Sequence, residues 1–509
     1  MESQYTYPWI PDAGDGTYCN PILHADYSDP DVIRHGGDFY MVASSFTATP
    51  GIPILHSTDM IHWTLINHAI ENVPHPRYSQ VQPGCGVWAP SIRFHAGKFW
   101  IFFPLPDEGI FITTAEDPAS KWSEPRLLQA AKGWIDPCPF WDDDGRAYLA
   151  HAYANSRAGI RDKIHIRPMA PDGSRLIGEG KIVIDTPHHP YLEGPKVHKL
   201  NGWYYILAPG GGVPQGWQVA FRSRKIYGPY EEKIVLEKGS TPINGPHQGA
   251  LVDLPSGQWW FFHFQDTGPF GRIVHLQPAE WRDGWPLMGK DLDGNGIGEP
   301  VERWKKPAVG QRSAPVAPQT SDEFNSARLA LQWQWQANHS KDWYSLSARP
   351  GWLRLFARTD SLKDLCLVSS LLMQKFPARG FSAETLLEVN ETVPGLSAGL
   401  AIVGGRESAS LALELAGKST ECVLRINGEV RFHVPLATKS IRLKVIVDAA
   451  ATCRFSYASE LMGTFKSIEQ FFWAKEGGWM GAKIGIFVLW SLDGSGGFAD
   501  FDYLRFGGT

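Results

Sequence analysis

The stretch KVHKLNGWYYIL, residues 196–207, decides how the first half of the chain folds. Two β-prone runs, Lys196–Leu200 and Trp203–Leu207, flank the dipeptide Asn201-Gly202. Asn-Gly between two such runs is the strongest short-range signal for a β-hairpin, because both residues accept the positive φ angles of a tight two-residue turn. The sequence therefore predicts an antiparallel hairpin at this point.

Four further hairpin signatures follow the same pattern. They cover residues 32–42, 91–102, 140–149 and 251–262, and each contains a Gly-bearing turn between two apolar runs. The five turns lie roughly 45–60 residues apart, which is close to the spacing of β-propeller blades. Helical periodicity is nearly absent from the chain. Five units predict an all-β fold built on a five-bladed β-propeller, whereas four or six blades would require a spurious or a missed unit.

The propeller is expected to fill residues 1–304. Residues 305–320 contain three prolines and few large apolar side chains, which indicates a linker. From residue 321 to residue 509, short alternating segments such as Ile441–Val447 are separated by Gly, Ser and Pro. This pattern predicts an antiparallel β-sandwich as the second domain, 321–509.

Charge and hydropathy exclude several kinds of partner. A formal net charge of -5 and the lack of a Lys/Arg cluster argue against a nucleic-acid partner. No apolar run approaches the length of a membrane span, so no membrane partner is expected. The first ten residues lack the basic and apolar regions of a signal peptide, and on that basis a cytoplasmic location is expected. The oligomeric state stays open, with a homo-oligomer among the alternatives.

A polar or aromatic residue precedes each hairpin turn at a similar distance. Asp29 and Asp136 lie seven residues before their turns, and Trp88, Glu193 and His247 lie eight residues before theirs. The first strand of each propeller blade runs beside the central channel, so residues at a shared offset converge at one end of the axis. The spacing therefore predicts one pocket with three carboxylates, a histidine and a tryptophan. Asx turns at the two aspartates and a core position for Trp88 are the structural alternatives.

Glu193 stands in an apolar stretch bracketed by prolines. Such a setting disfavours the charged carboxylate, so the pKa of Glu193 should be raised. A carboxyl group that stays protonated near neutral pH can act as a general acid. A single buried glutamate is more simply explained by pairing with Arg or Lys, and it is the matched offsets of the other residues that favour the catalytic interpretation.

The motifs around these positions carry a family resemblance. They are SDPD (28–31), VWAPS (87–91), IDP (135–137), EGPK (193–196), GPHQG (245–249) and GRIVHLQP (271–278). Together they resemble glycoside hydrolase family 43 over most of residues 18–305. The downstream stretch, with WQW at 333–335, is similar to the sandwich domain attached to the β-xylosidases of that family. The resemblance implies an inverting glycosidase that acts on pentose sugars.

The resemblance also implies roles for particular residues. Asp29 matches the family's general base and Glu193 its general acid. Asp136 matches the third carboxylate, which tunes the pKa of the acid and helps to orient the substrate. Inversion calls for catalytic carboxyls roughly 6.5–9.5 Å apart, so that a water fits beside the sugar. Positions lining the pocket for the terminal sugar match Phe46, Trp88 and Arg272.

His247 has two interpretations. A neutral histidine on the channel axis could hydrogen-bond a carboxylate or a water and so help to form the substrate site. The resemblance alternatively implies a hydrated calcium ion held by His247, although calcium prefers oxygen ligands. The chemistry itself requires no cofactor. Residues 291–302 also match the ligand spacing of an EF-hand calcium loop, but the flanks do not predict the two helices of that motif, which favours a plain loop.

The leading hypothesis is an exo-acting β-1,4-xylosidase that releases xylose from the non-reducing ends of xylo-oligosaccharides. An α-L-arabinofuranosidase that acts on arabinoxylo-oligosaccharides is the sister hypothesis, because its substrate presents similar hydroxyls. A retaining fructosidase propeller would need an Asn-Asp-Pro-Asn-Gly motif where Ser28–Asp31 stands. A non-catalytic carbohydrate-binding propeller would not need an acid, a base and a tuning carboxylate together.

One loop of the sandwich suggests contact with the propeller pocket. Residues 491–498 are Gly-rich and end in Phe498. Such a loop can extend beyond a sheet edge, and Phe498 would then narrow the pocket; a solvated hairpin tip is the alternative.

Overall fold

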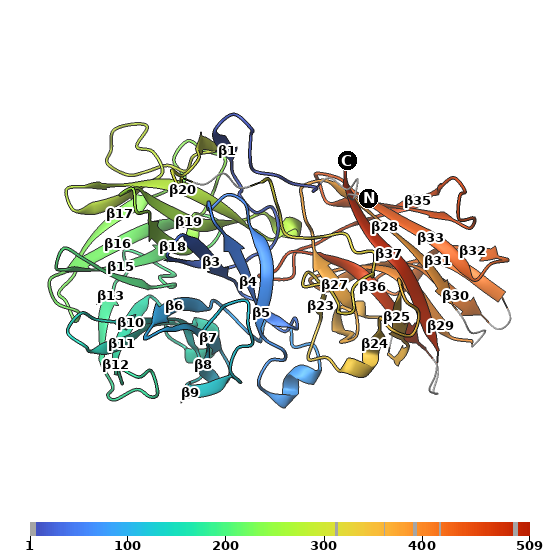
Figure 1. The fold of residues 1–509 in the computed structure, drawn as a ribbon, viewed down its shortest axis with the longest axis horizontal. Helices are drawn as coiled ribbons and strands as arrows, with labels where there is room; N and C mark the ends of the chain where they lie inside the picture. The colour runs from blue at the N-terminus through green and yellow to red at the C-terminus, as the bar shows by residue number, and fades with distance from the viewer. Residues whose placement is uncertain (1–6, 311–313, 361, 390–393, 417–418, 492–496) are drawn as a thin grey trace.

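The computed structural model describes residues 7–310, 314–360, 362–389, 394–416, 419–491 and 497–509. Two β domains lie side by side (Figure 1). The all-β prediction, a five-bladed β-propeller followed by a β-sandwich, is confirmed. The helical elements are short: η1 (Pro76–Ser79), α1 (Asn155–Ala158), η2 (Gly268–Phe270), η3 (Lys341–Trp343) and η4 (Leu365–Leu367). Within these described ranges, no helix is long and apolar enough to cross a membrane.

Five four-stranded antiparallel sheets form the blades, and the strands of each sheet follow one another in chain order. Blades one and two contain β2 (Asp31–His35), β3 (Asp38–Val42), β4 (Gly51–Ser57), β5 (Thr64–Ile70), β6 (Ser91–His95), β7 (Lys98–Leu105), β8 (Gly109–Ala115) and β9 (Arg126–Ala130). Blade three contains β10 (Trp134–Trp141), β11 (Ala147–Tyr153), β12 (Lys163–Met169) and β13 (Lys181–Asp185). Blades four and five contain β14 (Lys196–Leu200), β15 (Trp203–Gly210), β16 (Trp217–Ser223), β17 (Glu231–Leu236), β18 (His247–Asp253), β19 (Trp259–Asp266), β20 (Arg272–Arg282) and β21 (Trp285–Met288).

Turn chemistry explains why each blade begins with a hairpin. Asn201 and Gly202 have φ angles of 52° and 72°, as a two-residue turn with both central φ angles positive requires. The turn joins β14 to β15 with Leu200 opposite Trp203. The hairpin predicted from residues 196–207 is therefore present.

The ring closes between the first and the last blade. Val32 and Met41 of blade one share a hydrophobic core with Val252 and Phe262 of blade five. Outside the blades, β1 (Thr17–Cys19) pairs with β22 (Arg303–Lys305), so the chain enters and leaves the propeller at one place.

The sandwich consists of two antiparallel sheets, with one parallel strand at the edge of the first. That sheet runs β23 (Gln334–Trp335), β27 (Leu372–Lys375), β36 (Lys483–Trp490), β29 (Leu396–Gly404), β30 (Glu407–Ala416), β31 (Ser419–Ile426) and β32 (Glu429–Leu436), with β26 (Arg358–Thr359) beside β36. The other runs β24 (Tyr344–Ser345), β25 (Leu353–Phe356), β37 (Phe498–Gly508), β28 (Phe381–Val389), β33 (Ser440–Val447), β34 (Thr452–Ala458) and β35 (Lys466–Trp473). Alternate residues of β33 are buried, which is the pattern of a sheet with one face on the core.

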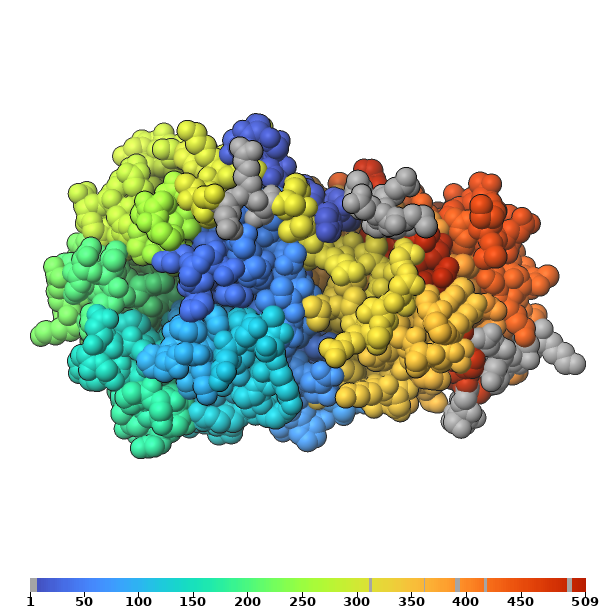
Figure 2. All heavy atoms as spheres, in the orientation of Figure 1, coloured from blue at the N-terminus to red at the C-terminus, as the bar shows by residue number. Residues whose placement is uncertain are grey.

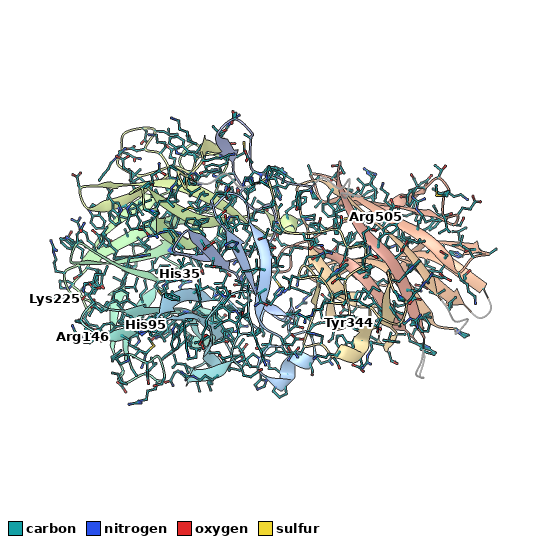
Figure 3. All side chains as sticks on the ribbon, viewed as in Figure 1. His35, His95, Arg146, Lys225, Tyr344 and Arg505 are labelled. Atoms are coloured by element: carbon teal, nitrogen blue, oxygen red, sulfur yellow. The ribbon has the colours of Figure 1, made fainter. Side chains whose placement is uncertain are left out.

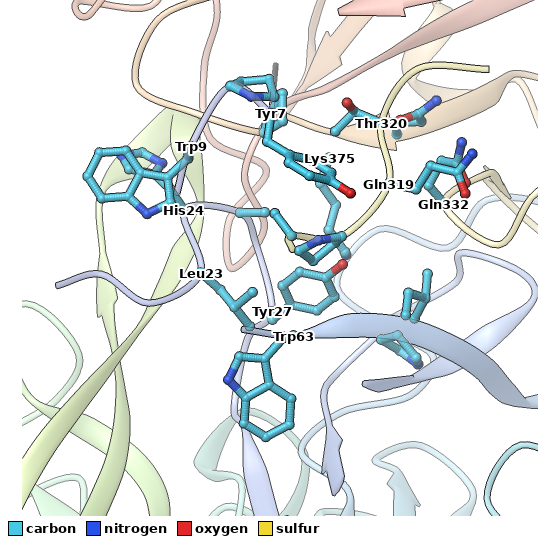
Figure 4. Close-up of a pocket in the computed structure, with 18 of the residues that line it drawn as sticks. Tyr7, Trp9, Leu23, His24, Tyr27, Trp63, Gln319, Thr320, Gln332 and Lys375 are labelled. Carbon is cyan, nitrogen blue, oxygen red and sulfur yellow. The ribbon is translucent and has the colours of Figure 1, made fainter. Parts of the chain in front are cut away.

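The two domains are joined by direct contacts over their shared side (Figure 2). The backbones of Thr49 and Trp335 exchange two hydrogen bonds, of 3.0 and 2.7 Å. Asn338 accepts a hydrogen bond from the Val73 N–H at 2.8 Å and donates one to the Val73 carbonyl at 2.9 Å. A small cavity of about 60 Å³ remains at the junction, lined by both domains (Figure 4). Figure 3 shows Arg146 and Lys225 at the side of the propeller that faces away from the sandwich.

The loop singled out at residues 491–498 does not bring Phe498 to the propeller. Residues 492–496 lie outside the described residues. Phe498 is the first residue of β37. The centroid of its ring lies 6.4 Å from the centroid of the Phe356 ring, and the guanidinium of Arg354 lies 3.7 Å from the centroid of the Phe498 ring. The hypothesis that Phe498 narrows the pocket is wrong, because its side chain packs within the sandwich.

Candidate active site

A cavity of about 370 Å³ opens at one end of the propeller axis, where the first strand of each blade begins. Its size suits a small ligand. Of the residues singled out from the sequence, the cavity is lined by Asp29, Phe46, Trp88, Asp136, Glu193 and Arg272. These residues come from all five blades or the segments leading into them, so the ring brings together positions that lie up to 243 residues apart.

Asp29 is buried and held by donors on three sides. Its Oδ2 accepts hydrogen bonds from the hydroxyls of Ser28 and Ser44 at 2.8 and 2.6 Å. Its Oδ1 accepts one from Arg272 Nη1 at 3.1 Å, and that same nitrogen lies 3.1 Å from Ser28 Oγ. Two hydroxyl donors and one guanidinium donor are partners that suit an ionised carboxylate. Asp29 is therefore arranged as a hydrogen-bond acceptor beside the cavity.

Glu193 has the opposite environment. Burial raises the pKa of Glu193 to about 8, and the negative charges of Asp136 and then Asp29 add to this rise. Thirty per cent of the side chain remains exposed, and it faces the cavity. A carboxyl group with this pKa keeps its proton at neutral pH and can donate it to a bound ligand.

Asp136 lies directly beside the backbone of the acid. Its Oδ2 accepts a hydrogen bond from the Gly194 N–H at 2.8 Å. Burial raises the pKa of Asp136 to about 7, with the charge of Asp29 contributing and the Gly194 hydrogen bond opposing. Gly194 has a φ of 59°, and a Cβ there would lie 2.9 Å from Gln248 Cγ, so glycine is required behind Glu193.

The backbone at the cavity rim is strained at several positions. Asp29, Phe46 and Asp136 have φ angles of 56°, 51° and 54°, and Gln248 has 32°. Non-glycine residues rarely adopt positive φ, and such residues are concentrated at functional sites. All four of these residues line the cavity.

His247 lies behind the pocket wall. It is fully buried, and its Nε2 lies 3.6 Å from Glu193 Oε1. Burial lowers the pKa of His247 to about 3, so the ring is neutral. The next residue, Gln248, takes the place in the cavity lining that the sequence had indicated for His247. The Gln248 side chain partly offsets the rise in the pKa values of Asp136 and Glu193.

Trp479 is a wall of the cavity that the sequence did not indicate. It belongs to the sandwich, and its ring contacts Trp88 edge-on with centroids 4.9 Å apart. The guanidinium of Arg157 lies 5.0 Å from the Trp88 ring. No local signal marks Trp479, because its contact with Trp88 is made only when the two domains dock. Gln248 could have been found, since it lies seven residues before its turn, as Asp29 and Asp136 do.

The described side chains do not form a calcium cage. Within the described ranges, no three His, Cys, Asp or Glu side chains converge as metal ligands would. A calcium ion at His247 would therefore take most of its six to eight oxygen ligands from water. In the EF-hand-like stretch, Asp291 instead accepts hydrogen bonds from the N–H groups of Gly294 and Gly296 and pairs with Arg282 at 3.3 Å.

Comparison with known proteins agrees with this geometry. Residues 18–286 match the model of glycosyl hydrolases family 43, and residues 321–507 match the beta xylosidase C-terminal Concanavalin A-like domain. A "Putative beta-xylosidase" of Xylanibacter ruminicola is 47% identical, over 74% of this chain and 69% of that protein. A "Beta-xylosidase" of Formosa agariphila is 38% identical, over 68% of this chain and 63% of that protein.

A solved structure shows the same two-domain arrangement. The crystal structure of xylan beta-1,4-xylosidase from Bacillus halodurans C-125 matches with a TM-score of 0.82 at 25% identity, over 96% of this chain and 99% of that chain. The paired environments of Asp29 and Glu193 supply an acceptor and a donor at one cavity, as glycoside hydrolysis requires. The chain is thus a glycosidase, and it belongs to glycoside hydrolase family 43.

Proposed function

We propose that this glycosidase is an exo-acting, inverting β-1,4-xylosidase that releases xylose from the non-reducing ends of xylo-oligosaccharides. The observation that carries the proposal is the contrast between two carboxyls in one cavity. Glu193 holds a proton because burial and neighbouring charge raise its pKa, while Asp29 accepts three hydrogen bonds, one of them from Arg272. The names of the relatives from Xylanibacter ruminicola and Formosa agariphila support xylose as the sugar.

In the proposed reaction, Glu193 donates its proton to the glycosidic oxygen as the bond from that oxygen to the anomeric carbon breaks. Asp29 accepts a proton from a water, whose oxygen forms the new bond on the opposite face of the sugar. Asp136 keeps Glu193 protonated through like-charge repulsion. The products are xylose of inverted anomeric configuration and an oligosaccharide shorter by one unit.

The cavity walls support action at chain ends. Trp88 and Trp479 meet edge-on beside the carboxyls, and aromatic rings of this kind pack against the apolar faces of sugars. The cavity volume of about 370 Å³ suits one or two sugar rings rather than a long chain.

Initial rates on p-nitrophenyl β-D-xylopyranoside and p-nitrophenyl α-L-arabinofuranoside, measured side by side, test the proposal. The xyloside should be hydrolysed with the higher kcat/KM, and Asp29→Asn should remove activity on both. A higher kcat/KM for the arabinofuranoside would make the α-L-arabinofuranosidase the main activity. Sugar binding without turnover of either substrate would indicate a carbohydrate-binding propeller instead.

A further inference from the structure

A buried carboxylate connects the active-site arginine to the sandwich domain. Asp26 lies three residues before Asp29 and is 6% exposed. Its Oδ1 accepts a hydrogen bond from the backbone N–H of Arg272 at 3.0 Å. Its Oδ2 accepts one from the backbone N–H of Gly481, in the sandwich, at 2.9 Å. One side chain therefore holds both Arg272 and the sandwich segment that carries Trp479.

The backbones at this junction are packed too closely to accept further atoms. A Cβ on Gly271 would lie 2.5 Å from the Asp26 Cβ, and a Cβ on Gly481 would lie 2.6 Å from the Gly271 nitrogen. The Ala482 N–H also donates a hydrogen bond to the Pro269 carbonyl at 2.8 Å. Residues 269–272 are therefore confined between Asp26 on one side and the docked sandwich on the other.

The sandwich presents two cations to the same carboxylate. Lys375 and Lys483 are cross-strand partners on β27 and β36, and the negative charge of Asp26 favours the charged form of both. Burial lowers the pKa of Lys483 to about 8, and repulsion from Lys375 contributes to this fall. Lys375 lies 5.3 Å from the centroid of the Tyr27 ring (Figure 4). Asp26 is thus the counter-charge at a place where the sandwich carries two neighbouring lysines.

We infer that Asp26 is a positioning residue that keeps Arg272 against Asp29, and that it does so only while the sandwich is docked through Gly481. The chain of contacts is continuous, since Asp26 holds the Arg272 backbone and Arg272 Nη1 lies 3.1 Å from Asp29 Oδ1. The inference rests on the proposed function, in which Asp29 is the general base. If the guanidinium moves away, the base is protonated more easily, because a nearby cation favours the charged form of a carboxylate.

Asp26→Asn tests the inference with a side chain of nearly the same shape. Asparagine keeps one acceptor oxygen but turns an NH2 group towards one of the two N–H donors, so one hydrogen bond is lost. We expect kcat/KM for p-nitrophenyl β-D-xylopyranoside to fall about tenfold. We also expect the acidic limb of the pH profile to move to higher pH. Gly481→Ala, which opens the same contact from the sandwich side, should move the limb in the same direction.

Asn338→Ala is the matched control, because Asn338 also joins the domains through two hydrogen bonds but does not line the cavity. It should lower the unfolding temperature and leave the acidic limb in place. The inference fails if the acidic limb stays in place in both Asp26→Asn and Gly481→Ala. If Asp26→Asn does not fold, an unmoved acidic limb in Gly481→Ala is sufficient to overturn the inference. It also fails if Asn338→Ala moves the limb equally. Retained activity in Asp29→Asn would instead refute the proposed function.

Discussion

Replacing Asp136 by Asn should move the basic limb of the pH–rate profile to lower pH. The pKa of Glu193 is raised from 4.5 to about 8, first by burial and second by the charge of Asp136. Asparagine is uncharged, but its amide oxygen can still accept the Gly194 hydrogen bond that Asp136 Oδ2 accepts at 2.8 Å. The substitution therefore removes the repulsion and leaves the local geometry in place.

The size of the effect follows from Coulomb's law. Two carboxylates roughly 6 Å apart at an effective dielectric constant of about 20 repel by about 2.8 kcal/mol, which corresponds to about 2 pKa units. Burial contributes more than this charge does, so a fall of about 1–2 units in the pKa of Glu193 is expected. At pH 7 the protonated fraction of Glu193 would then fall about two- to tenfold. The raised pKa keeps Glu193 protonated, and so active, as the pH rises. When this pKa is lowered, the activity is lost at a lower pH on the basic side of the profile.

The assay is kcat/KM for xylobiose between pH 4 and pH 9, because xylobiose has a poor leaving group and needs the proton. The rate of the variant should recover towards acidic pH. Asp143→Asn is the control, since Asp143 lies in the same blade but 85% of its side chain is exposed. A basic limb at the same pH in Asp136→Asn and in the unsubstituted protein would refute the reasoning.

Three further predictions concern the acid, the stereochemistry and the sandwich wall. Glu193→Gln should abolish turnover of xylo-oligosaccharides and largely spare aryl glycosides with acidic leaving groups; equal losses on both would remove Glu193 as the acid. Proton NMR of the first-formed xylose should show the α-anomer from a β-linked substrate, whereas the β-anomer would make Asp29 a nucleophile. Trp479→Ala should raise KM for xylobiose about threefold to tenfold through lost ring contact. Trp473→Ala, on the exposed sandwich surface, should leave KM unchanged, and equal KM values in the two variants would contradict the role of Trp479.

The local parts of this protein are readable from its sequence. A hairpin such as Lys196–Leu207 is set by the positive φ angles of Asn201 and Gly202 and by β-prone neighbours, all within twelve residues. Five such units at similar spacing fix the number of blades, and a shared offset from each turn places Asp29, Asp136 and Glu193 at one end of the axis. Short-range conformational preference is sufficient for each of these conclusions.

Only the tertiary structure decided which side chain of a strand faces the cavity and which residues of the sandwich contact the propeller. The pairing of β18 with β19 shifts register between His247 and Gly249, and at this point Gln248 lines the cavity while His247 lies behind it. Successive side chains of a strand point to opposite sides, so only one of these two neighbours can face the cavity, and the observed offsets of seven and eight residues admit either one. Trp479 joins the cavity wall, and Asp26 accepts a hydrogen bond from Gly481, only through contacts between the two domains. Those contacts depend on the fit of two complete surfaces, which no local pattern encodes.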